Sequence, residues 1–384
     1  MTIKLYDENS YLTSFEATVI SCEKIEDKYK TELDKTAFFP EEGGQCADGG
    51  TIDGIEVTYV ELCGDKIYHY TDKSFETGKS VKGEIDFGLR FRNMQNHTGE
   101  HIISGIAHRL YGYENVGFHL GRDNVTMDLS GPLRQDDIDK IELLANEIVY
   151  KNMAITAVYP SNEELLNINY RAKGEIKENI RIVTIGDADC CACCAPHVKQ
   201  TGEVGIIKIL SFMNYKGGTR LTIACGKDAL CDYMYKHRQN ENISTLLSVK
   251  QNETFRGVEK LIEDIGALNS KLSEKSGKIA KYITKDIKET DENIIVFADD
   301  LDVPSLRMIA NDIKDKTKKI AVVLSGDDES GYKYVIISKD SDVLKITKNA
   351  NNALSGRGGG RDNMATGTFG ATGEEIEKYF KMQN

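Results

Sequence analysis

Residues 89–112 read LRFRNMQNHTGEHIISGIAHRLYG, and the character of the chain changes at this stretch. Met94, Ile102, Ile106 and Leu110 recur at helical spacing, which predicts a helix with one apolar face. Residues 1–90 instead consist of short β-branched or aromatic runs separated by GG, DG and GD pairs, a pattern typical of a small β-barrel or curled sheet. Beyond the helix, strand and helix signals alternate, so the predicted fold class is α+β.

Four parts are predicted along the chain. A glycine-rich β-barrel occupies residues 1–90, an α+β domain 91–238, a helical spacer 239–290 and an α/β domain 291–384. Apolar residues from Leu246 to Leu272 recur at helical spacing, which predicts an extended helix or helical hairpin acting as a spacer or dimer contact. The alternative is an amphipathic helix that lies on its own domain.

Composition excludes several classes of protein. The 384 residues hold 49 Lys and Arg against 61 Asp and Glu, so a net charge of −12 excludes a wholly basic nucleic-acid binder but not a local basic groove. No apolar run approaches the ~18 residues of a membrane span, and the start lacks the order of a signal peptide. Nine cysteines without a spaced disulfide framework predict a reducing, cytoplasmic location.

Two pairs of side chains have the spacing of metal ligands. His97 and His101 lie one helical turn apart, so both imidazoles project from one face of the helix. Cys193 and His197 form a second pair with the same spacing. Two ligand pairs that a fold brings together are the usual construction of a tetrahedral zinc site.

The cysteine cluster offers a rival interpretation. Cys190 with Cys193, or Cys191 with Cys194, form CxxC pairs. Such a pair can bind a structural zinc ion or act as a redox couple. The spacing alone leaves this alternative open.

Two glycine-rich segments are candidate ligand contacts. In TAFFPEEGGQCADGG (36–50), Gly43 and Gly44 allow the backbone to approach a ligand, and Gln45 can donate and accept hydrogen bonds. The same pattern also suits a tight barrel turn. In SGRGGGRDNM (355–364), Arg357 and Arg361 flank glycines whose N–H groups could cradle phosphate, although the lysine of a P-loop is missing.

Three motifs together resemble the AlaX family, the free-standing relatives of the editing domain of alanyl-tRNA synthetase. LDKTAFFPEEGGQCADGG (33–50) resembles the family's barrel motif, RNMQNHTGEH (92–101) its HxxxH helix, and CCAPHV (193–198) its CxxxH element. Residues 239–384 resemble the C-terminal extension of the long forms. One departure is that Cys194, Ala195 and Pro196 stand where the family usually has Gly-Gly-Thr, so proline stiffens this loop.

The resemblance implies hydrolysis, in trans, of tRNA(Ala) mischarged with serine, and with glycine as a second substrate, while Ala-tRNA(Ala) is spared. It implies a Zn²⁺ ion held by His97, His101, Cys193 and His197, a zinc-binding editing domain at 91–238 and a tRNA-binding domain at 291–384. Thr36 is expected to recognise the serine hydroxyl and Gln45 to orient water or substrate. His119 lies in a segment that matches the family and is a further catalytic candidate.

Basic residues near these motifs are the candidate tRNA contacts. Lys199, Lys216, Arg220 and Lys227 could meet the acceptor end, and Arg357 and Arg361 the elbow or body of the tRNA. With a net charge of −12, such binding should be modest and sensitive to salt. A homodimer is compatible with the helical spacer.

Several other functions compete with this one. Threonyl-tRNA synthetase editing domains share the HxxxH and CxxxH elements, which leaves Ser-tRNA(Thr) as a substrate. A zinc-stabilised tRNA-binding module without catalysis, or a redox protein that uses the cysteines, are alternatives of other classes. No segment could host ATP-dependent amino-acid activation, and no Asp-His-His run suggests a phosphoesterase.

Overall fold

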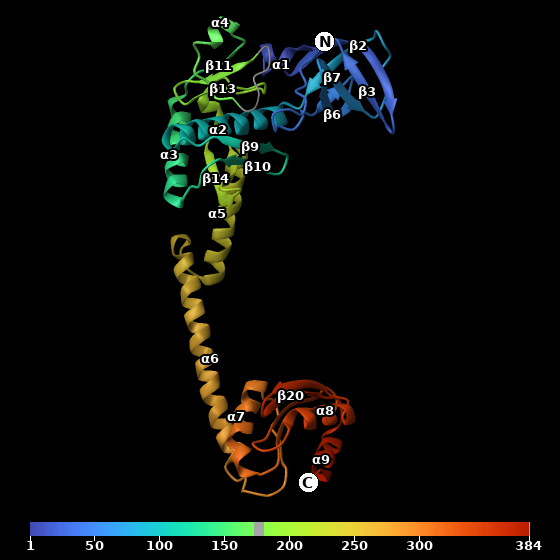
Figure 1. Ribbon diagram of the computed structural model, residues 1–384, viewed down its shortest axis with the longest axis vertical. Coiled ribbons are helices and arrows are strands. Elements are labelled where there is room, and N and C mark those ends of the chain that lie inside the picture. Colours follow the sequence, from blue (N-terminus) through green and yellow to red (C-terminus); the bar gives the residue numbers. More distant parts are fainter. Residues whose placement is uncertain (173–179, 384) are drawn as a thin grey trace. The chain divides into compact units, whose positions relative to one another are not determined.

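The computed structural model describes residues 1–172 and 180–383 (Figure 1). The chain divides into two compact units, Met1–Asn240 and Glu241–Asn384. Helices and several separate sheets occur in the chain, which confirms the mixed α+β class. The finer division into four domains stays a prediction.

The first part of the N-terminal unit is a closed sheet. Its strands are β2 (Ser14–Ile25), β3 (Lys28–Leu33), β5 (Gly50–Ile52), β6 (Ile55–Cys63), β7 (Lys66–Thr71) and β8 (Ser80–Ile85). Strand β8 pairs with both β5 and β2, which closes a barrel in the order β2-β3-β7-β6-β5-β8. Two short strands, β1 (Ile3–Lys4) and β4 (Lys35–Thr36), pair in parallel beside helix α1 (Leu5–Glu8). Alternate residues of each strand face inward, and Phe15, Val19, Phe38 and Ile52 belong to the barrel core.

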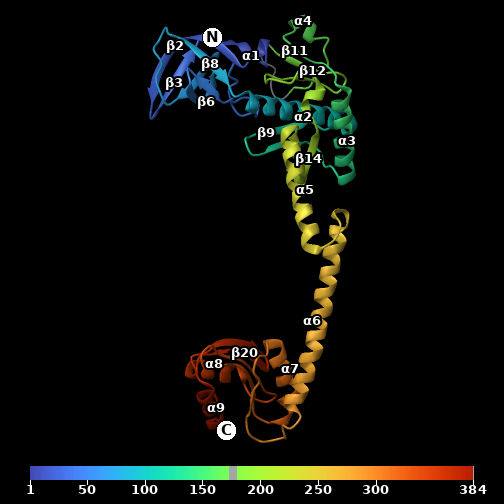
Figure 2. The same ribbon diagram turned by 180° about the vertical axis from the view of Figure 1, so that it is seen from behind.

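Helix α2 (Phe87–Tyr111) is the centre of the rest of this unit. It lies between a four-stranded sheet of order β14-β15-β10-β9 and a three-stranded sheet of order β11-β12-β13, with α3 beside it (Figures 1 and 2). These elements are β9 (Asn115–Leu120), β10 (Val125–Leu129), α3 (Gln135–Lys151), β11 (Ile155–Val158), α4 (Asn162–Leu165), β12 (Ile182–Ile185), β13 (Asp189–Ala192), β14 (Ile207–Tyr215) and β15 (Gly218–Cys225).

Two glycines let the sheets approach α2 closely. A Cβ atom on Gly105 would collide with the carbonyl oxygen of Ala188, and one on Gly99 with the sulfur of Cys225. The backbone of α2 can therefore contact β13 on one side and β15 on the other. This contact places the helix against the strand that precedes the second predicted ligand pair.

Helix α5 (Lys227–Leu247) crosses the boundary between the units, and the C-terminal unit continues with α6 (Thr254–Thr284). The sheet of this unit has the order β16-β17-β18-β20-β19. Its elements are β16 (Ile294–Phe297), α7 (Val303–Ile313), β17 (Ala321–Asp327), β18 (Gly331–Ile337), α8 (Val343–Ala353), β19 (Arg357–Arg361), β20 (Met364–Phe369) and α9 (Gly373–Met382). None of the described helices is long and apolar enough to cross a membrane.

The predicted helical region is helical and consists of two helices, α5 and α6, which the prediction of an extended helix or helical hairpin allowed. The C-terminal end of α6 packs on α7 through the buried Ala280, so the alternative of a helix lying on its own domain holds at this end. Toward the N-terminal end of α6 the apolar side chains are exposed to solvent: the exposed fraction is 76% for Phe255 and 63% for Leu268. That these exposed apolar side chains form a dimer contact stays a prediction.

Candidate functional site

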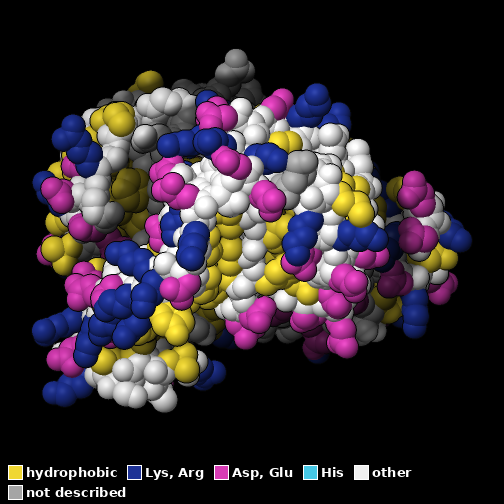
Figure 3. Space-filling view, turned by 90° about the horizontal axis from the view of Figure 1, so that it is seen from below, with side chains coloured by type: hydrophobic (Ala, Val, Ile, Leu, Met, Phe, Trp, Pro, Cys, Tyr) yellow, Lys and Arg dark blue, Asp and Glu magenta, His cyan; other side chains and the backbone are white. Residues whose placement is uncertain are grey.

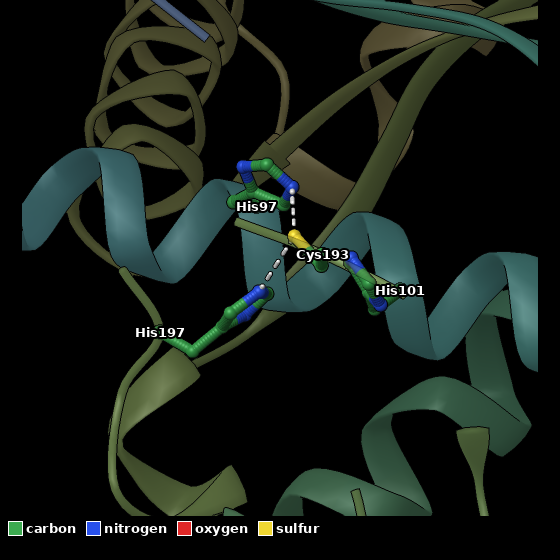
Figure 4. A group of neighbouring side chains, drawn as sticks. All are labelled: His97, His101, Cys193 and His197. Atoms are coloured by element: carbon green, nitrogen blue, oxygen red, sulfur yellow. Dashed lines mark hydrogen bonds between the residues drawn. The ribbon is translucent and has the colours of Figure 1, made fainter. Parts of the chain in front are cut away.

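The four predicted ligands come together between α2 and the loop after β13. The ligand atoms of His97, His101, Cys193 and His197 all lie within 4.8 Å of one another (Figure 4). The Cys193 sulfur is 3.5 Å from His97 Nε2 and 3.4 Å from His197 Nε2. Nitrogen and sulfur ligands of a tetrahedral zinc ion lie about 3.3–3.7 Å apart, so this donor set fits a zinc ion.

Each of the three histidines is held at its Nδ1 atom by a side-chain oxygen. The bonds join His97 to Gln45 Oε1 at 2.8 Å, His101 to Asp189 Oδ2 at 2.9 Å, and His197 to Thr98 Oγ1 at 3.0 Å. An Nδ1–H that donates to such an oxygen leaves the Nε2 lone pair free. Histidines that ligate metals have this arrangement, and it orients all three Nε2 atoms toward one point.

Asp189 is a buried carboxylate that the sequence analysis missed. It accepts hydrogen bonds from Arg171 Nε at 2.8 Å and Nη2 at 2.9 Å as well as from His101. Burial opposes ionisation, but His101 and Arg171 outweigh it and hold the pKa of Asp189 below its usual value. Burial lowers the pKa of His101, yet the Asp189 hydrogen bond leads the contributions that raise it well above its usual value. His101 is therefore a more basic, stronger metal ligand.

Cys193 and His197 also have shifted pKa values. Burial opposes ionisation of the Cys193 thiol, but the charges and hydrogen bonds of the histidines hold its pKa well below the usual value. Burial lowers the pKa of His197 to about 4. A thiolate and a neutral imidazole are the forms that bind metal. Cys193 and His197 therefore have metal-binding forms near neutral pH, whereas a metal ion must displace a proton from His101, whose pKa is raised.

Hydrogen bonds from two side chains to backbone carbonyl oxygens hold the loop that carries Cys193 and His197. Arg181 Nη1 donates to the carbonyl oxygens of Cys193 at 3.1 Å and Ala195 at 2.8 Å. Ser10 Oγ donates to the carbonyl oxygen of His197 at 3.0 Å. These three hydrogen bonds hold the loop backbone at Cys193, Ala195 and His197.

The glycine loop from Glu42 to Gln45 is pinned to β9. Leu120 N–H donates to the Gly44 carbonyl at 2.7 Å, and Gly44 has φ +82° with its Cα against the Phe118 carbonyl. The close approach expected of these glycines therefore occurs toward β9, whose Phe118 ring also packs on His97 at 4.9 Å. Gln45 is fully buried, and its Nε2 atom has no partner within residues 1–172 and 180–383.

Thr36 is buried in the barrel beside a histidine. Its Oγ1 lies 2.8 Å from His69 Nε2 and accepts from Phe38 N–H at 3.1 Å. His69 Nδ1 lies 3.2 Å from the Thr31 carbonyl, and burial lowers the pKa of His69 to about 4. The neutral ring thus donates through Nδ1 and accepts through Nε2. The Thr36 hydroxyl therefore donates to His69 and keeps one lone pair for another donor.

The other predicted residues lie apart from the four ligands. His119 is exposed on β9, because its neighbours Phe118 and Leu120 take the face toward the site and strand residues alternate. Lys199 lies over the Tyr11 ring at 4.7 Å, and Arg220 is paired with Asp128 at 2.6 Å.

The remaining basic candidates lie at the surface. Lys216 is in the turn between β14 and β15, Lys227 begins α5, and Arg357 and Arg361 are exposed on β19. The glycines between these two arginines form an edge strand paired with β20 instead of a phosphate-binding loop. On the face shown in Figure 3, acidic and basic side chains are interspersed.

Replacement of Asp189 by asparagine is expected to weaken metal binding by roughly 10- to 100-fold, because His101 loses its charged partner. Competition with a chromophoric chelator measures this affinity. Asp187→Asn, a change at an exposed carboxylate nearby, serves as the matched control. Equal affinities of the two variants would show that Asp189 does not support the metal site.

Comparison with known proteins agrees with this arrangement. The model of the threonyl and alanyl tRNA synthetase second additional domain matches residues 180–222, and that of the DHHA1 domain matches residues 291–382. The alanyl-tRNA editing protein AlaX-L of Pyrococcus horikoshii is 31% identical, over 98% of this chain and 96% of its own. Alanyl-tRNA editing protein Aarsd1 of Danio rerio is 25% identical over 91% of this chain. The chain is also 28% identical to alanine–tRNA ligase of Ignicoccus hospitalis, but spans only 41% of that enzyme.

The matched domains therefore place this chain among proteins that carry a synthetase-type editing domain followed by a DHHA1 domain. Within that class it belongs to the AlaX family of alanyl-tRNA editing proteins, in its long form.

Proposed function

We propose that this chain is a zinc-containing deacylase that hydrolyses Ser-tRNA(Ala) in trans, and Gly-tRNA(Ala) as a second substrate, while it spares Ala-tRNA(Ala). The observation that carries the proposal is the group of four donors whose three imidazoles are each held at Nδ1. His97, His101, Cys193 and His197 would hold the zinc ion, which would supply positive charge near the ester. The family membership supports tRNA as the partner.

Gln45 is the proposed donor to the reacting carbonyl. Its Oε1 atom accepts from His97, so its Nε2 atom is the end that remains for the substrate. An N–H group aimed at the ester oxygen stabilises the negative charge that develops there in the transition state. The amide needs no reorganisation at that moment because His97 already holds it.

Thr36 is the proposed reader of the serine side chain. Its hydroxyl donates to His69, so its free lone pair can accept a hydrogen bond from the serine hydroxyl. Alanine has no such donor, and the site's polar group would then be left unpaired. A site of this kind can disfavour the analogue by ~10⁴–10⁵-fold.

The tRNA contacts are proposed at exposed basic residues. Lys199 lies close in sequence to His197, and Arg357 and Arg361 are exposed in the DHHA1 segment. Phosphate contacts made by such residues would weaken as salt rises. A cytoplasmic location and a homodimer belong to the same proposal.

Ser-tRNA(Thr) is a weaker candidate substrate. The matched editing-domain model covers both threonyl and alanyl synthetases, so it does not separate the two tRNAs. The near full-length similarity to AlaX-L favours tRNA(Ala).

Deacylation of Ser-tRNA(Ala) and Ala-tRNA(Ala) by wild type and His101→Ala tests the proposal. Wild type is expected to release serine and spare alanine, and His101→Ala to lose activity because a metal ligand is gone. His108→Ala, an exposed histidine on the same helix, is the matched control and should behave as wild type. Ser-tRNA(Thr) is included as a competing substrate.

A folded, zinc-loaded wild type that hydrolyses none of these esters would contradict the editing function. It would favour the alternative of a zinc-stabilised tRNA-binding module. Faster cleavage of Ser-tRNA(Thr) than of Ser-tRNA(Ala) would reassign the substrate.

A further inference from the structure

Three buried polar atoms without partners occur beside the Cys193–Cys194 turn. They are Tyr6 Oη, Glu42 Oε2 and Gln45 Nε2, none of which has a hydrogen bond within the described ranges 1–172 and 180–383. Tyr6 is 2% exposed and Gln45 is fully buried. Buried polar groups in proteins are nearly always paired, so three unpaired atoms in one place indicate a ligand.

The three atoms lie on adjoining segments. Glu42 and Gln45 exchange backbone hydrogen bonds of 3.2 and 3.0 Å across the glycine turn. In that turn, a Cβ atom on Gly43 would lie 3.8 Å from the Cys194 sulfur. The Tyr6 ring packs on Phe39 at 5.4 Å. Burial, and then the charges of Asp7, Glu42 and Cys194, raise the pKa of Tyr6, so it remains a neutral phenol.

The protein supplies no cation for Glu42. Among residues 1–172 and 180–383 no ion pair involves Glu42, and the Cys194 thiol hydrogen-bonds its side chain, which leaves Oε2 without a partner. The guanidinium of Arg181 contacts this loop but is committed to the Asp7 carboxylate at 3.8 Å and to two carbonyl oxygens. A shielded carboxylate oxygen without a countercharge favours a positively charged ligand.

We infer that Glu42 and Tyr6 receive the α-ammonium group of the aminoacyl ester, while Gln45 faces its carbonyl oxygen. The inference rests on the proposed function. The ammonium donates to Glu42 Oε2 and to the Tyr6 phenol oxygen. Gly43 and Gly44, both exposed, leave the turn open to solvent for its approach.

The contact between Glu42 and the ammonium group selects esters with a free α-amino group, and it does not distinguish their amino-acid side chains. Serine, glycine and alanine esters all carry the ammonium, so Glu42 positions each of them equally. Esters with a blocked amine, such as N-acetylseryl esters, cannot neutralise the carboxylate and are excluded. Discrimination between serine and alanine is left to another residue, for which Thr36 is proposed.

The test uses the full-length zinc-loaded protein and two non-hydrolysable probes. One is 3′-seryl-amino-3′-deoxyadenosine, in which an amide replaces the ester, and the other is its glyceryl analogue, in which a hydroxyl replaces the ammonium. Glu42→Gln is expected to weaken calorimetric binding of the seryl probe by roughly 10- to 100-fold. Binding of the glyceryl probe should be unchanged.

Two further measurements make the test specific. Glu41→Gln, at the exposed neighbouring carboxylate, should bind both probes as wild type does. Glu42→Gln should raise the melting temperature of the free protein, because it removes a carboxylate that no cation partners among the described residues. A residue with only a structural role would lower it.

Equal effects of Glu42→Gln on both probes, or no effect on either, would overturn the inference. So would wild-type protein that binds the glyceryl probe as tightly as the seryl probe. Wild type that binds the seryl probe selectively but does not hydrolyse Ser-tRNA(Ala) would overturn the proposed function and leave the inference standing.

Discussion

Removal of zinc is expected to abolish deacylation and to lower the melting temperature of the N-terminal unit by roughly 8–16 °C. At a free zinc concentration of 1,000 times the Kd, binding to the native state stabilises it by ~4 kcal/mol. For a domain of this size, ~1 kcal/mol corresponds to about 2–4 °C. The physical reason is that the four donors come from two segments, α2 and the loop after β13, which a bound zinc ion would link. Calorimetry of the chelated and the reconstituted protein measures both states.

A Cys193→Ser variant should reproduce the loss, and Cys190→Ser should not. The Cys190 sulfur lies 3.6 Å from the Thr184 hydroxyl and outside the group of four donors. Retention of one zinc ion by Cys190→Ser would therefore separate this site from the CxxC alternative. If the Cys190→Ser variant instead loses zinc and the Cys193→Ser variant retains it, the proposed ligand set is wrong.

Replacement of Arg90 by methionine is expected to cost about 3–5 kcal/mol of unfolding free energy, because it leaves the Asp48 carboxylate buried and unpaired. Neither side chain of this pair is exposed. Arg90 Nε lies 3.0 Å from both Asp48 oxygens, and its Nη1 and Nη2 atoms donate to the carbonyls of Ser10 and Ala37. Chemical denaturation followed by circular dichroism measures the change.

The control for this variant is an exposed ion pair. Lys82→Met removes the partner of Glu84 at the barrel surface, where both side chains are more than half exposed. Such pairs contribute ~0–1 kcal/mol. The double change Arg90→Met with Asp48→Leu should recover part of the loss, because no charge then remains buried. A loss below ~1 kcal/mol for Arg90→Met alone would contradict this account.

Local patterns explain how much of the fold could be predicted. The apolar face of residues 89–112 and the i, i+4 spacing of His97 and His101 lie within one helix, and that helix is α2. The glycine-bounded runs before it became strands β2 to β8 for the same reason.

Contacts between distant segments could not be predicted. Asp189 supports His101 from 88 residues away, and no local pattern marks its carboxylate. Helix α8 has a weak apolar pattern in the sequence, since polar residues surround the few apolar ones that it buries, such as Val343 and Ala350. The glycine run 357–361 suggested a phosphate-binding loop, but its edge-strand pairing depends on β20, which follows it.

The separation of the two ligand pairs also governs how the site is made in the cell. His97 and Cys193 lie 96 residues apart. At roughly 5–20 residues per second, a ribosome needs about 5–20 s to synthesise that interval. During this time the nascent chain carries two imidazoles without the sulfur and third nitrogen that complete the set. Loading of the proposed metal centre would therefore follow synthesis of residues 193–197, and a chain arrested before Cys193 lacks two of the four donors.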